Sequence, residues 1–339
     1  MELFTVLTVA VVVVAVVGWK PLRKWLKGGR CHSNARMDGK TVIITGCNTG
    51  IGKETAKDLA KRGARVIMAC RNMEKAKAAQ LDIIRESGSS NVVVKRLDLA
   101  SMKSIREFAD EIKSEEESLH ALLNNAAIAV CPPSKTEDGF EMQFGTNHLG
   151  HFLLTLLLLD LLKTSAPSRI INVSSLAYLR GKINFDDIML TKNYDNFGAY
   201  SQSKLANIIF TSELARRLKG TGVTCYSLHP GPVETDILRH RDTYNAVWTI
   251  VLFFSEPFFK TAEEGAQTSI HCCVDKKAGQ ETGLYYSFVC LMGMTVSPTA
   301  QIVSKQTMRN RAKRRQNRSN KTSSSNVTKL RMKKKDQQR

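Results

Sequence analysis

The feature that most constrains the fold is a glycine-rich turn between an apolar strand and an amphipathic helix. Residues 40–46 read KTVIITG, a short apolar run typical of a buried strand. Residues 53–63 have the spacing of an amphipathic helix that ends in glycine. The turn between them carries Gly46, Gly50 and Gly52, spaced G-x3-G-x-G. Glycine permits a tight turn and a close approach of backbone to a ligand, so this turn predicts an α/β unit.

Strand and helix patterns continue to alternate as far as residue 231. Alternation of this kind predicts right-handed crossovers and a doubly wound parallel sheet. We therefore predict a Rossmann-like α/β fold in a single domain over residues 39–304. Further strands are expected at 64–70, 91–99, 120–127, 168–175 and 222–231, and further helices up to about 87 and at 104–116, 150–163 and 199–220.

The formal charge of +19 is concentrated at the C-terminal end. Residues 305–339 hold 14 Lys and Arg and one acidic residue, Asp336, so they carry 14 − 1 = +13. They are polar and lack apolar periodicity, which predicts a disordered basic tail. Such a tail favours contact with anionic lipid, and without interleaved aromatic residues it does not predict stacking on nucleic-acid bases.

Residues 3–19 hold no charge and are followed by KPLRKWLKGGR, which contains five Lys and Arg. Seventeen helical residues span about 26 Å, enough to cross the bilayer core. We predict a transmembrane signal-anchor at 1–19, a basic linker at 20–38 and, by the positive-inside rule, a cytosolic domain. A buried strand or core helix is the alternative for the apolar run.

The eight cysteines have neither the CxxC pairing nor the neighbouring histidines of a zinc site. In a chain of this length they indicate free thiols in a reducing compartment. We therefore predict no metal.

The glycine turn predicts a dinucleotide site in which a pyrophosphate rests on the N-terminus of the following helix. The second strand ends at Cys70 and Arg71, where NAD-binding proteins place a carboxylate. A guanidinium pairs with a 2′-phosphate, so this position favours NADP(H). An ordinary turn and a solvated Arg71 are the alternatives. The expected contacts from the turn are Gly46, Cys47, Asn48, Thr49, Gly50, Ile51 and Gly52.

Several motifs together resemble the short-chain dehydrogenase/reductase superfamily: TGCNTGIG, NNAA, the set Ser175–Tyr200–Lys204, and HPGPVET. The stretches TNHLGHFLLT, INVSSLAY and YSQSKLANIIFTSELARRLKGTGVT are similar to the membrane-anchored retinol dehydrogenase branch. The resemblance covers roughly residues 20–300. It implies a nicotinamide-dependent oxidoreductase that interconverts an alcohol and its carbonyl compound.

Tyr200 stands four residues before Lys204, so the two share one face of the predicted helix. The resemblance implies that Tyr200 is the proton donor and that Lys204, with an oxidised nicotinamide, stabilises its phenolate. Ser175 would hydrogen-bond the substrate oxygen, and Asn147 would hold a water that links Lys204 to solvent. Taken singly, serine and tyrosine are common at strand and helix ends, and Asn147 could be a cap.

The resemblance also implies further cofactor contacts. Asp98, with Leu99 beside it, would lie at the adenine, and Asn125 and Ala126 would line the cofactor. The remaining contacts, at the nicotinamide, would come from Pro230, Gly231, Val233 and Thr235. We interpret Tyr178, His148, His151 and His229 as structural.

Two positions depart from the family pattern. Ala127 replaces the glycine of the usual NNAG motif, which adds a methyl group beside the cofactor. The basic tail stands where the branch has a Trp-containing helical segment.

Residues 176–199, between Ser175 and Tyr200, are expected to form part of the substrate wall. Residues 245–259 are apolar and aromatic, which predicts either a core helix or a lid against the bilayer. The resemblance implies retinol and retinal, and steroids or lipid-derived aldehydes are the alternatives. A cytosol-facing, NADP(H)-dependent enzyme of the endoplasmic reticulum membrane would mainly reduce its substrate. A catalytically silent, membrane-tethered binding protein is the alternative from another class.

Overall fold

The sheet is built from the apolar runs that the sequence predicts as strands. The computed structural model describes residues 28–233, 259–287 and 297–298. In this part of the chain seven strands are parallel, and an eighth pairs antiparallel with the last of them. The strands are β1 (Thr41–Thr45), β2 (Arg65–Cys70), β3 (Val92–Arg96), β4 (Ala121–Asn124), β5 (Ser168–Val173), β6 (Val223–His229), β7 (Leu284–Ser287) and β8 (Ser297–Pro298).

The strand order, β3-β2-β1-β4-β5-β6-β7-β8, confirms the predicted doubly wound, Rossmann-like fold in a single domain. β1 lies between β2 and β4, with Ile43 opposite Ile67 on one side and Leu122 on the other. The direction of winding therefore reverses at β1. Ligands of such sheets bind in the crevice at the carboxyl ends of the strands beside this reversal.

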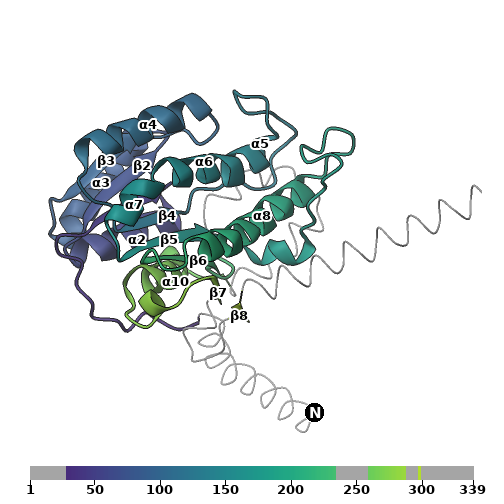
Figure 1. Cartoon of the computed structure of the whole chain (residues 1–339). Helices are drawn as coiled ribbons and strands as arrows, with labels where there is room; N and C mark the ends of the chain where they lie inside the picture. Colours follow the sequence, from purple (N-terminus) through teal and green to yellow (C-terminus); the bar gives the residue numbers. More distant parts are fainter. Residues whose placement is uncertain (1–27, 234–258, 288–296, 299–339) are drawn as a thin grey trace, which may run out of the picture. The chain divides into compact units, whose positions relative to one another are not determined.

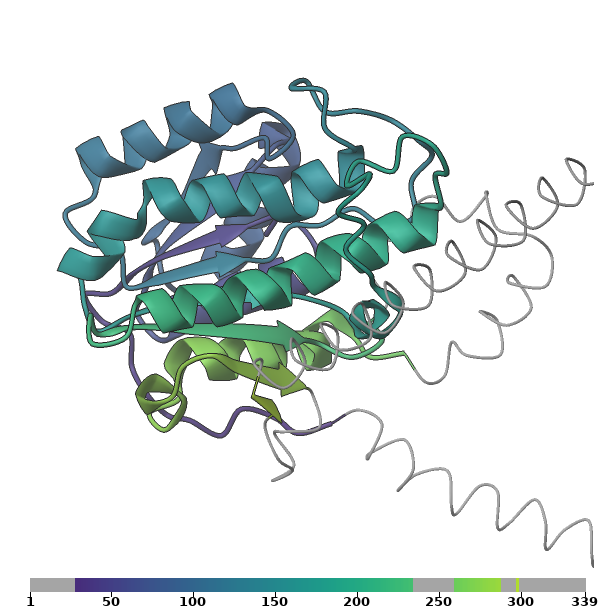
Figure 2. The ribbon, with the colours of Figure 1, turned by 45° about the vertical axis from the view of Figure 1, so that its right-hand side comes forward.

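Helices cover both faces of the sheet, as Figures 1 and 2 show. One face packs against α2 (Gly50–Lys61), α3 (Met73–Ser87) and α10 (Ala262–Val274). The other face packs against α4 (Met102–Glu115), α6 (Gly150–Leu157), α7 (Leu159–Thr164) and α8 (Asn196–Arg217). The remaining elements are short: α5 (Met142–Phe144), the π-helical turn η1 (Gly145–Leu149), and the 3-10 turns η2 (Leu176–Arg180) and η6 (Ala278–Gln280).

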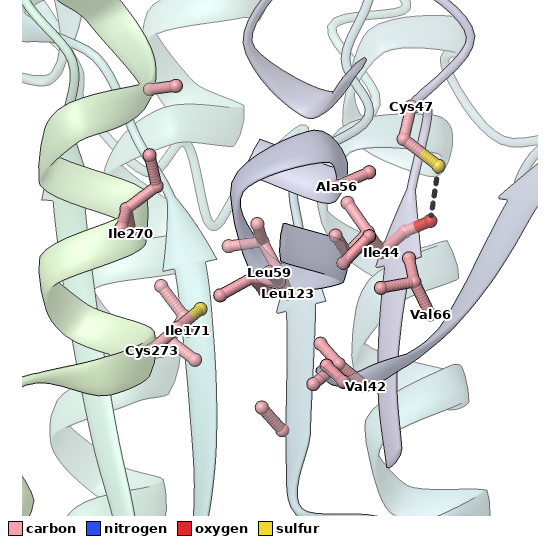
Figure 3. Close-up of a cluster of buried hydrophobic side chains, with 14 of the residues drawn as sticks. Val42, Ile44, Cys47, Ala56, Leu59, Val66, Leu123, Ile171, Ile270 and Cys273 are labelled. Atoms are coloured by element: carbon pink, nitrogen blue, oxygen red, sulfur yellow. Dashed lines mark hydrogen bonds between the residues drawn. The ribbon is translucent and has the colours of Figure 1, made fainter. Parts of the chain in front are cut away.

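The two cores follow from the alternation of side chains along each strand. On β1, Val42 and Ile44 join the core under α2, α3 and α10, while Ile43 joins the core under α4 and α8. Figure 3 shows the first core, where Leu59 of α2 and Ile270 of α10 face the strands. Burying one such aliphatic side chain stabilises the fold by about 1.5–3 kcal/mol, so the two cores fix the strand ends that carry the site.

The helix predicted over 150–163 is divided into α6 and α7. Leu158 has φ −97° and ψ 2°, outside the helical region, which ends α6 and begins α7. Its amide still donates to Leu154 O at 3.1 Å, so the division is a local bend. The π-helical turn η1 before α6 is not predicted by the apolar pattern.

The predicted anchor at 1–19, most of the segment 245–259 and the basic tail from 305 lie outside the described residues. Among the residues that are described, the structure contains no helix long and apolar enough to span a membrane.

Candidate active site

A cavity of about 980 Å³ lies at the carboxyl ends of the parallel strands. The turns after all of the first six strands contribute to it, which is the position that the strand order predicts for a ligand. Most of the residues proposed from the sequence are among those that line it: Gly46, Asn48, Thr49, Gly50, Ile51, Gly52, Arg71, Asp98, Leu99, Asn125, Ala126, Ser175, Tyr200, Lys204, Pro230, Gly231 and Val233.

Two glycines of the first turn are packed too closely by neighbouring residues to accept a side chain. A Cβ on Gly46 would lie 2.8 Å from the Cβ of Ala126, and one on Gly52 would lie 2.5 Å from Gly46 O. Gly46 also has φ +63°, a conformation that favours glycine. Glycine at these two positions therefore allows the tight turn that packs against the segment after β4.

The N-terminus of α2 is open towards the cavity. Its N-cap residue, Thr49, makes no side-chain capping hydrogen bond, and the first turn of the helix holds no acidic residue. The first amides of a helix point away from its body without partners inside the helix and carry a partial positive charge. This arrangement suits the pyrophosphate of a dinucleotide.

Two proposed residues, Cys47 and Asn147, do not line the cavity as expected. The side chain of Cys47 is buried in the core, where its thiol donates to Ile44 O at 3.1 Å, as Figure 3 shows. Only its backbone can therefore serve the turn. Asn147 is buried behind the wall, and Thr235 lies outside the described residues.

Basic groups gather where β2 ends. Cys70, the last residue of β2, is buried, and Arg71 is exposed at the cavity. Lys75, from the first turn of α3, lines the same region. The acidic residues that line the cavity, Asp98 and Asp195, come from other segments.

The turn after β4 is fastened to the glycine turn. The hydroxyl of Thr45 accepts hydrogen bonds from Asn125 N at 2.9 Å and Ala126 N at 3.0 Å. The side-chain amide of Asn125 in turn donates to Thr45 O and Gly46 O. Ala127 follows in the same turn with a negative φ, so alanine in place of glycine adds no left-handed strain there.

Ser175, Tyr200 and Lys204 converge on the cavity. Ser175 follows β5 and caps the 3-10 turn η2, and it hydrogen-bonds the phenol of Tyr200. One turn along α8, the Lys204 ammonium lies 5.7 Å from the centre of the Tyr200 ring. The preceding serine, Ser174, is buried and donates to Lys204 O at 2.8 Å. Both serines line the cavity, but the Ser174 hydroxyl is engaged with Lys204 O, and it is Ser175 whose hydroxyl meets the phenol of Tyr200.

Burial controls the charges of this group. It raises the pKa of Tyr200 to about 12, which the hydrogen bond with Ser175 opposes. It also lowers the pKa of Lys204 to about 7, because the side chain is almost fully enclosed. From the family resemblance we expect Lys204, together with an oxidised nicotinamide, to stabilise the phenolate of Tyr200. In the protein without cofactor, burial dominates and keeps the phenol protonated.

Asn147 lies in η1, one layer behind the cavity. Its side chain is fully buried, accepts from Ile128 N at 2.9 Å and donates to Ile128 O at 2.9 Å and Ser203 Oγ at 3.1 Å. These bonds join the segment after β4 to α8. The side chain therefore supports the wall of the cavity, whereas Ser175, Tyr200 and Lys204 face it.

Part of the cavity lining is apolar, and sequence reasoning named none of these residues individually. Ile128, Ala129 and Val130 continue from the turn after β4, and Phe197 and Phe259 come from distant segments. Val130 has φ +54°, which is rare for a β-branched residue. The available signals were the position of Ile128, Ala129 and Val130 just after NNAA and of Phe197 just before Tyr200. Phe259 is the last residue of the apolar segment 245–259.

Comparison with known proteins identifies sequences of the same kind. The model of the short chain dehydrogenase family matches residues 40–245. Human retinol dehydrogenase 12 is 52% identical over 266 residues, covering 78% of this chain and 83% of that protein. Mouse retinol dehydrogenase 13 is 51% identical over 285 residues, with 83% and 85% covered.

Solved structures show the same fold. An uncharacterized protein from Mycobacterium Paratuberculosis has a TM-score of 0.62 and 36% identity, covering 80% of this chain and 88% of that chain. A short chain dehydrogenase from Pseudomonas syringae has a TM-score of 0.61 and 24% identity, with 76% and 98% covered.

Proposed function

Because the chain belongs to the retinol dehydrogenase branch of the short-chain dehydrogenase/reductase superfamily, we propose that it is an NADP(H)-dependent oxidoreductase acting on a retinoid. The observation that carries the proposal is the meeting of Ser175, Tyr200 and Lys204 at a cavity whose other end has an open helix N-terminus. One end suits a dinucleotide, and the other suits an apolar carbonyl compound.

The preference for NADP(H) is supported by the charges at the end of β2. Arg71 and Lys75 line the cavity beside the end of β2, where we expect the 2′-phosphate on the adenosine ribose, and no carboxylate follows Cys70 directly. A carboxylate there would repel the phosphate, whereas a guanidinium can bind it through two hydrogen bonds.

The nicotinamide, when bound, supplies the hydride for reduction of a carbonyl carbon or accepts it in the reverse direction. Ser175 would donate a hydrogen bond to the carbonyl oxygen, which polarises the bond and orients the substrate. Tyr200 would give its phenolic proton to the same oxygen as negative charge develops there. A phenol with its pKa raised by burial starts in the protonated form that this step requires.

Lys204 would then return a proton to the site. Its pKa of about 7 allows the side chain to exchange a proton near neutral pH, while Tyr200 alone titrates far above it. Reduction consumes one proton per turnover, so the carbonyl compound becomes the alcohol with the hydride on carbon and the phenolic proton on oxygen.

The substrate class is supported by the apolar end of the cavity. Ile128, Val130, Phe197 and Phe259 offer aliphatic and aromatic surface of the kind that encloses a lipophilic molecule. Proteins named retinol dehydrogenases are about half identical to this chain, which favours retinal and retinol over steroids or lipid aldehydes.

We place the protein in the endoplasmic reticulum membrane, held by the uncharged segment 3–19, with its catalytic domain in the cytosol. NADP(H) in the cytosol is kept reduced, so reduction of the aldehyde would be the main direction. The basic tail would add attraction to anionic lipid headgroups.

The test is consumption of NADPH by the full-length protein in vesicles supplied with all-trans-retinal, beside a steroid ketone and a lipid aldehyde. We expect retinal to be reduced fastest, with NADPH preferred over NADH. NADPH binding without turnover of any of the three would instead support a catalytically silent binding protein.

A further inference from the structure

His151 links two regions of the site. One is the pair of loops after β1 and β4, which the cofactor would touch, and the other is the π-helical turn η1, which carries Asn147. His151 stands in the first turn of α6 and is only 2% exposed. Its Nδ1 atom lies 3.1 Å from Asn147 O, and its Nε2 atom lies 2.9 Å from the hydroxyl of Thr45. A single side chain thus joins residues that are 106 positions apart in the sequence.

The chemistry of the partners determines where each proton sits. A carbonyl can only accept, so the Nδ1 atom of His151 must carry the hydrogen that points to Asn147 O. Burial lowers the pKa of His151 to about 3, so the ring is neutral and its Nε2 atom has no hydrogen. The hydroxyl of Thr45 must therefore donate to Nε2.

This donation sets the direction of the Thr45 hydroxyl. With its hydrogen on His151, its lone pairs face Asn125 N and Ala126 N, which donate to it at 2.9 and 3.0 Å. The other acceptor near the hydroxyl is Leu123 O, at 3.5 Å, too far for a strong hydrogen bond. Without His151, the hydroxyl would lose the partner that fixes its rotation.

The second contact leads to the catalytic lysine. In the π-helical turn, Gly150 N donates five residues back, to Gly145 O. Asn147 O accepts from the His151 ring and from the Asn207 amide at 3.2 Å. Asn207 also donates to Val173 O at 3.4 Å, and Lys204 Nζ donates to the same oxygen at 3.1 Å. A continuous hydrogen-bonded path therefore runs from the cofactor loop to Lys204.

We propose that His151 is a positioning residue for the cofactor: it orients the Thr45 hydroxyl and thereby holds Asn125 and Ala126 in the shape that lines the dinucleotide site. The inference rests on the proposed function, because the ligand of these loops is taken to be NADP(H). It replaces the interpretation of His151 as structural alone, since a ring that only filled the core would need neither nitrogen.

Three substitutions separate the two nitrogens. In His151→Gln the end of the side chain reaches the place of Nε2, and its amide oxygen can accept from Thr45. In His151→Asn the amide reaches the place of Nδ1, so only the bond to Asn147 O can be kept. His151→Leu removes both bonds and retains an apolar side chain of moderate size.

A second set of variants tests the same bond from the other side. Thr45→Val removes the hydroxyl, and it is combined with His151→Leu in a double-mutant cycle. The matched control is Thr268→Val, the same exchange at a hydroxyl on α10 that is buried and has no hydrogen bond to any residue the structure describes. Neither Thr45→Val nor the Asn and Gln variants empty the core, so the test does not depend on His151→Leu folding.

The measurement is the Kd of the full-length protein for NADPH, from NADPH fluorescence, with the thermal midpoint recorded for each variant. We expect His151→Gln and Thr268→Val to stay within about twofold of wild type. His151→Asn loses only the bond to Thr45 and should raise the Kd about three- to tenfold, the loss of one buried neutral hydrogen bond. His151→Leu and Thr45→Val lose more than one bond and should raise the Kd at least as much. The double variant should bind no more weakly than Thr45→Val alone.

Other results would overturn the inference. If His151→Gln binds NADPH as weakly as His151→Leu, NADPH affinity depends on the volume of the imidazole ring and not on an acceptor for the Thr45 hydroxyl. If all His151 variants bind like wild type, or if the effects of the double variant add, His151 does not act through Thr45. If wild type itself binds no NADPH, the failure belongs to the proposed function.

Discussion

The ammonium of Lys204 lies 5.7 Å from the centre of the Tyr200 ring, one helical turn along α8, and donates its hydrogen bond to Val173 O. The two side chains are positioned together by the same helix but are held by different partners. Ser175 contacts the phenol, and the last residue of β5 contacts the ammonium. The pair is therefore assembled before any cofactor arrives.

Replacing Lys204 by methionine should stabilise the protein near neutral pH. Folded Lys204 loses its proton at about pH 7, whereas an unfolded lysine holds it to about pH 10.4. Between these values the unfolded state binds more protons, so wild-type stability rises with pH. The stability gained by Lys204→Met should be on the order of a few kcal/mol at pH 6.5 and smaller at pH 9.

The measurement is urea unfolding of the cofactor-free protein at both pH values, with wild type and Lys204→Met side by side. A gap between the two proteins that is the same at pH 6.5 and pH 9 would contradict the lowered pKa of Lys204.

Arg71→Ala should weaken NADPH binding much more than NADH binding. Loss of a charge-assisted hydrogen bond to the 2′-phosphate corresponds to about a ten- to hundredfold increase in the Kd for NADPH. Arg85→Ala is the matched control, because Arg85 is an exposed residue of α3 that pairs with Asp82. Titration of each protein with both cofactors checks the prediction, and equal losses for NADPH and NADH would refute the 2′-phosphate contact.

Tyr194→Phe should affect the substrate end of the cavity without changing the cofactor end. The Tyr194 hydroxyl donates to Cys131 O at 3.0 Å and accepts from the Gln143 amide at 2.9 Å. Gln143 in turn accepts from Val130 N at 2.8 Å, which holds the left-handed turn at Val130 in the apolar wall. We expect KM for retinal to rise about three- to tenfold while the Kd for NADPH stays unchanged.

Initial rates at varied retinal concentration check this, with Tyr178→Phe as the control. Tyr178 packs against Tyr285 outside the cavity lining, so the KM of Tyr178→Phe for retinal should match that of wild type. A change in NADPH affinity with no change in KM would place the effect of Tyr194 elsewhere.

The orientation in the membrane can be tested at the C-terminal tail. The tail contains three N-x-S/T sequons, at Asn317, Asn320 and Asn326. A cytosolic tail never meets the lumenal transferase, so we expect no shift in gel mobility after endoglycosidase treatment and full digestion of the tail by protease outside sealed vesicles. A glycosylated or protected tail would reverse the orientation and remove the argument for a cytosolic NADPH pool.

What could be predicted from the sequence is what depends on local spacing. The glycines of the first turn indicate a tight turn from their spacing alone. The four-residue step from Tyr200 to Lys204 places both side chains on one face of a helix. The burial of Cys47 could not be read from its place in the same turn, because it depends on how the turn packs on the core. The second strand brings Cys70 to 3.8 Å from Cys47, and both side chains belong to the apolar core under α2, α3 and α10.

Long-range contacts explain the rest of what the sequence did not reveal. Asn147 is found behind the wall because Ile128 and Ser203, on either side of it in sequence, meet there. The link from His151 to Thr45 crosses from one motif to another, and neither motif contains a sign of it. The pKa of Tyr200 likewise depends on the enclosing side chains, which no spacing rule gives.

The central claim is that Tyr200 delivers the proton, and the most direct measurement compares turnover with binding in Tyr200→Phe. The benzene ring stays in place, so the Kd for NADPH should remain within about twofold of wild type. The rate of retinal-dependent NADPH oxidation should fall by about 10²–10⁴-fold, the contribution typical of a positioned general acid. A variant that binds NADPH normally and still reduces retinal at a rate close to wild type would contradict the account.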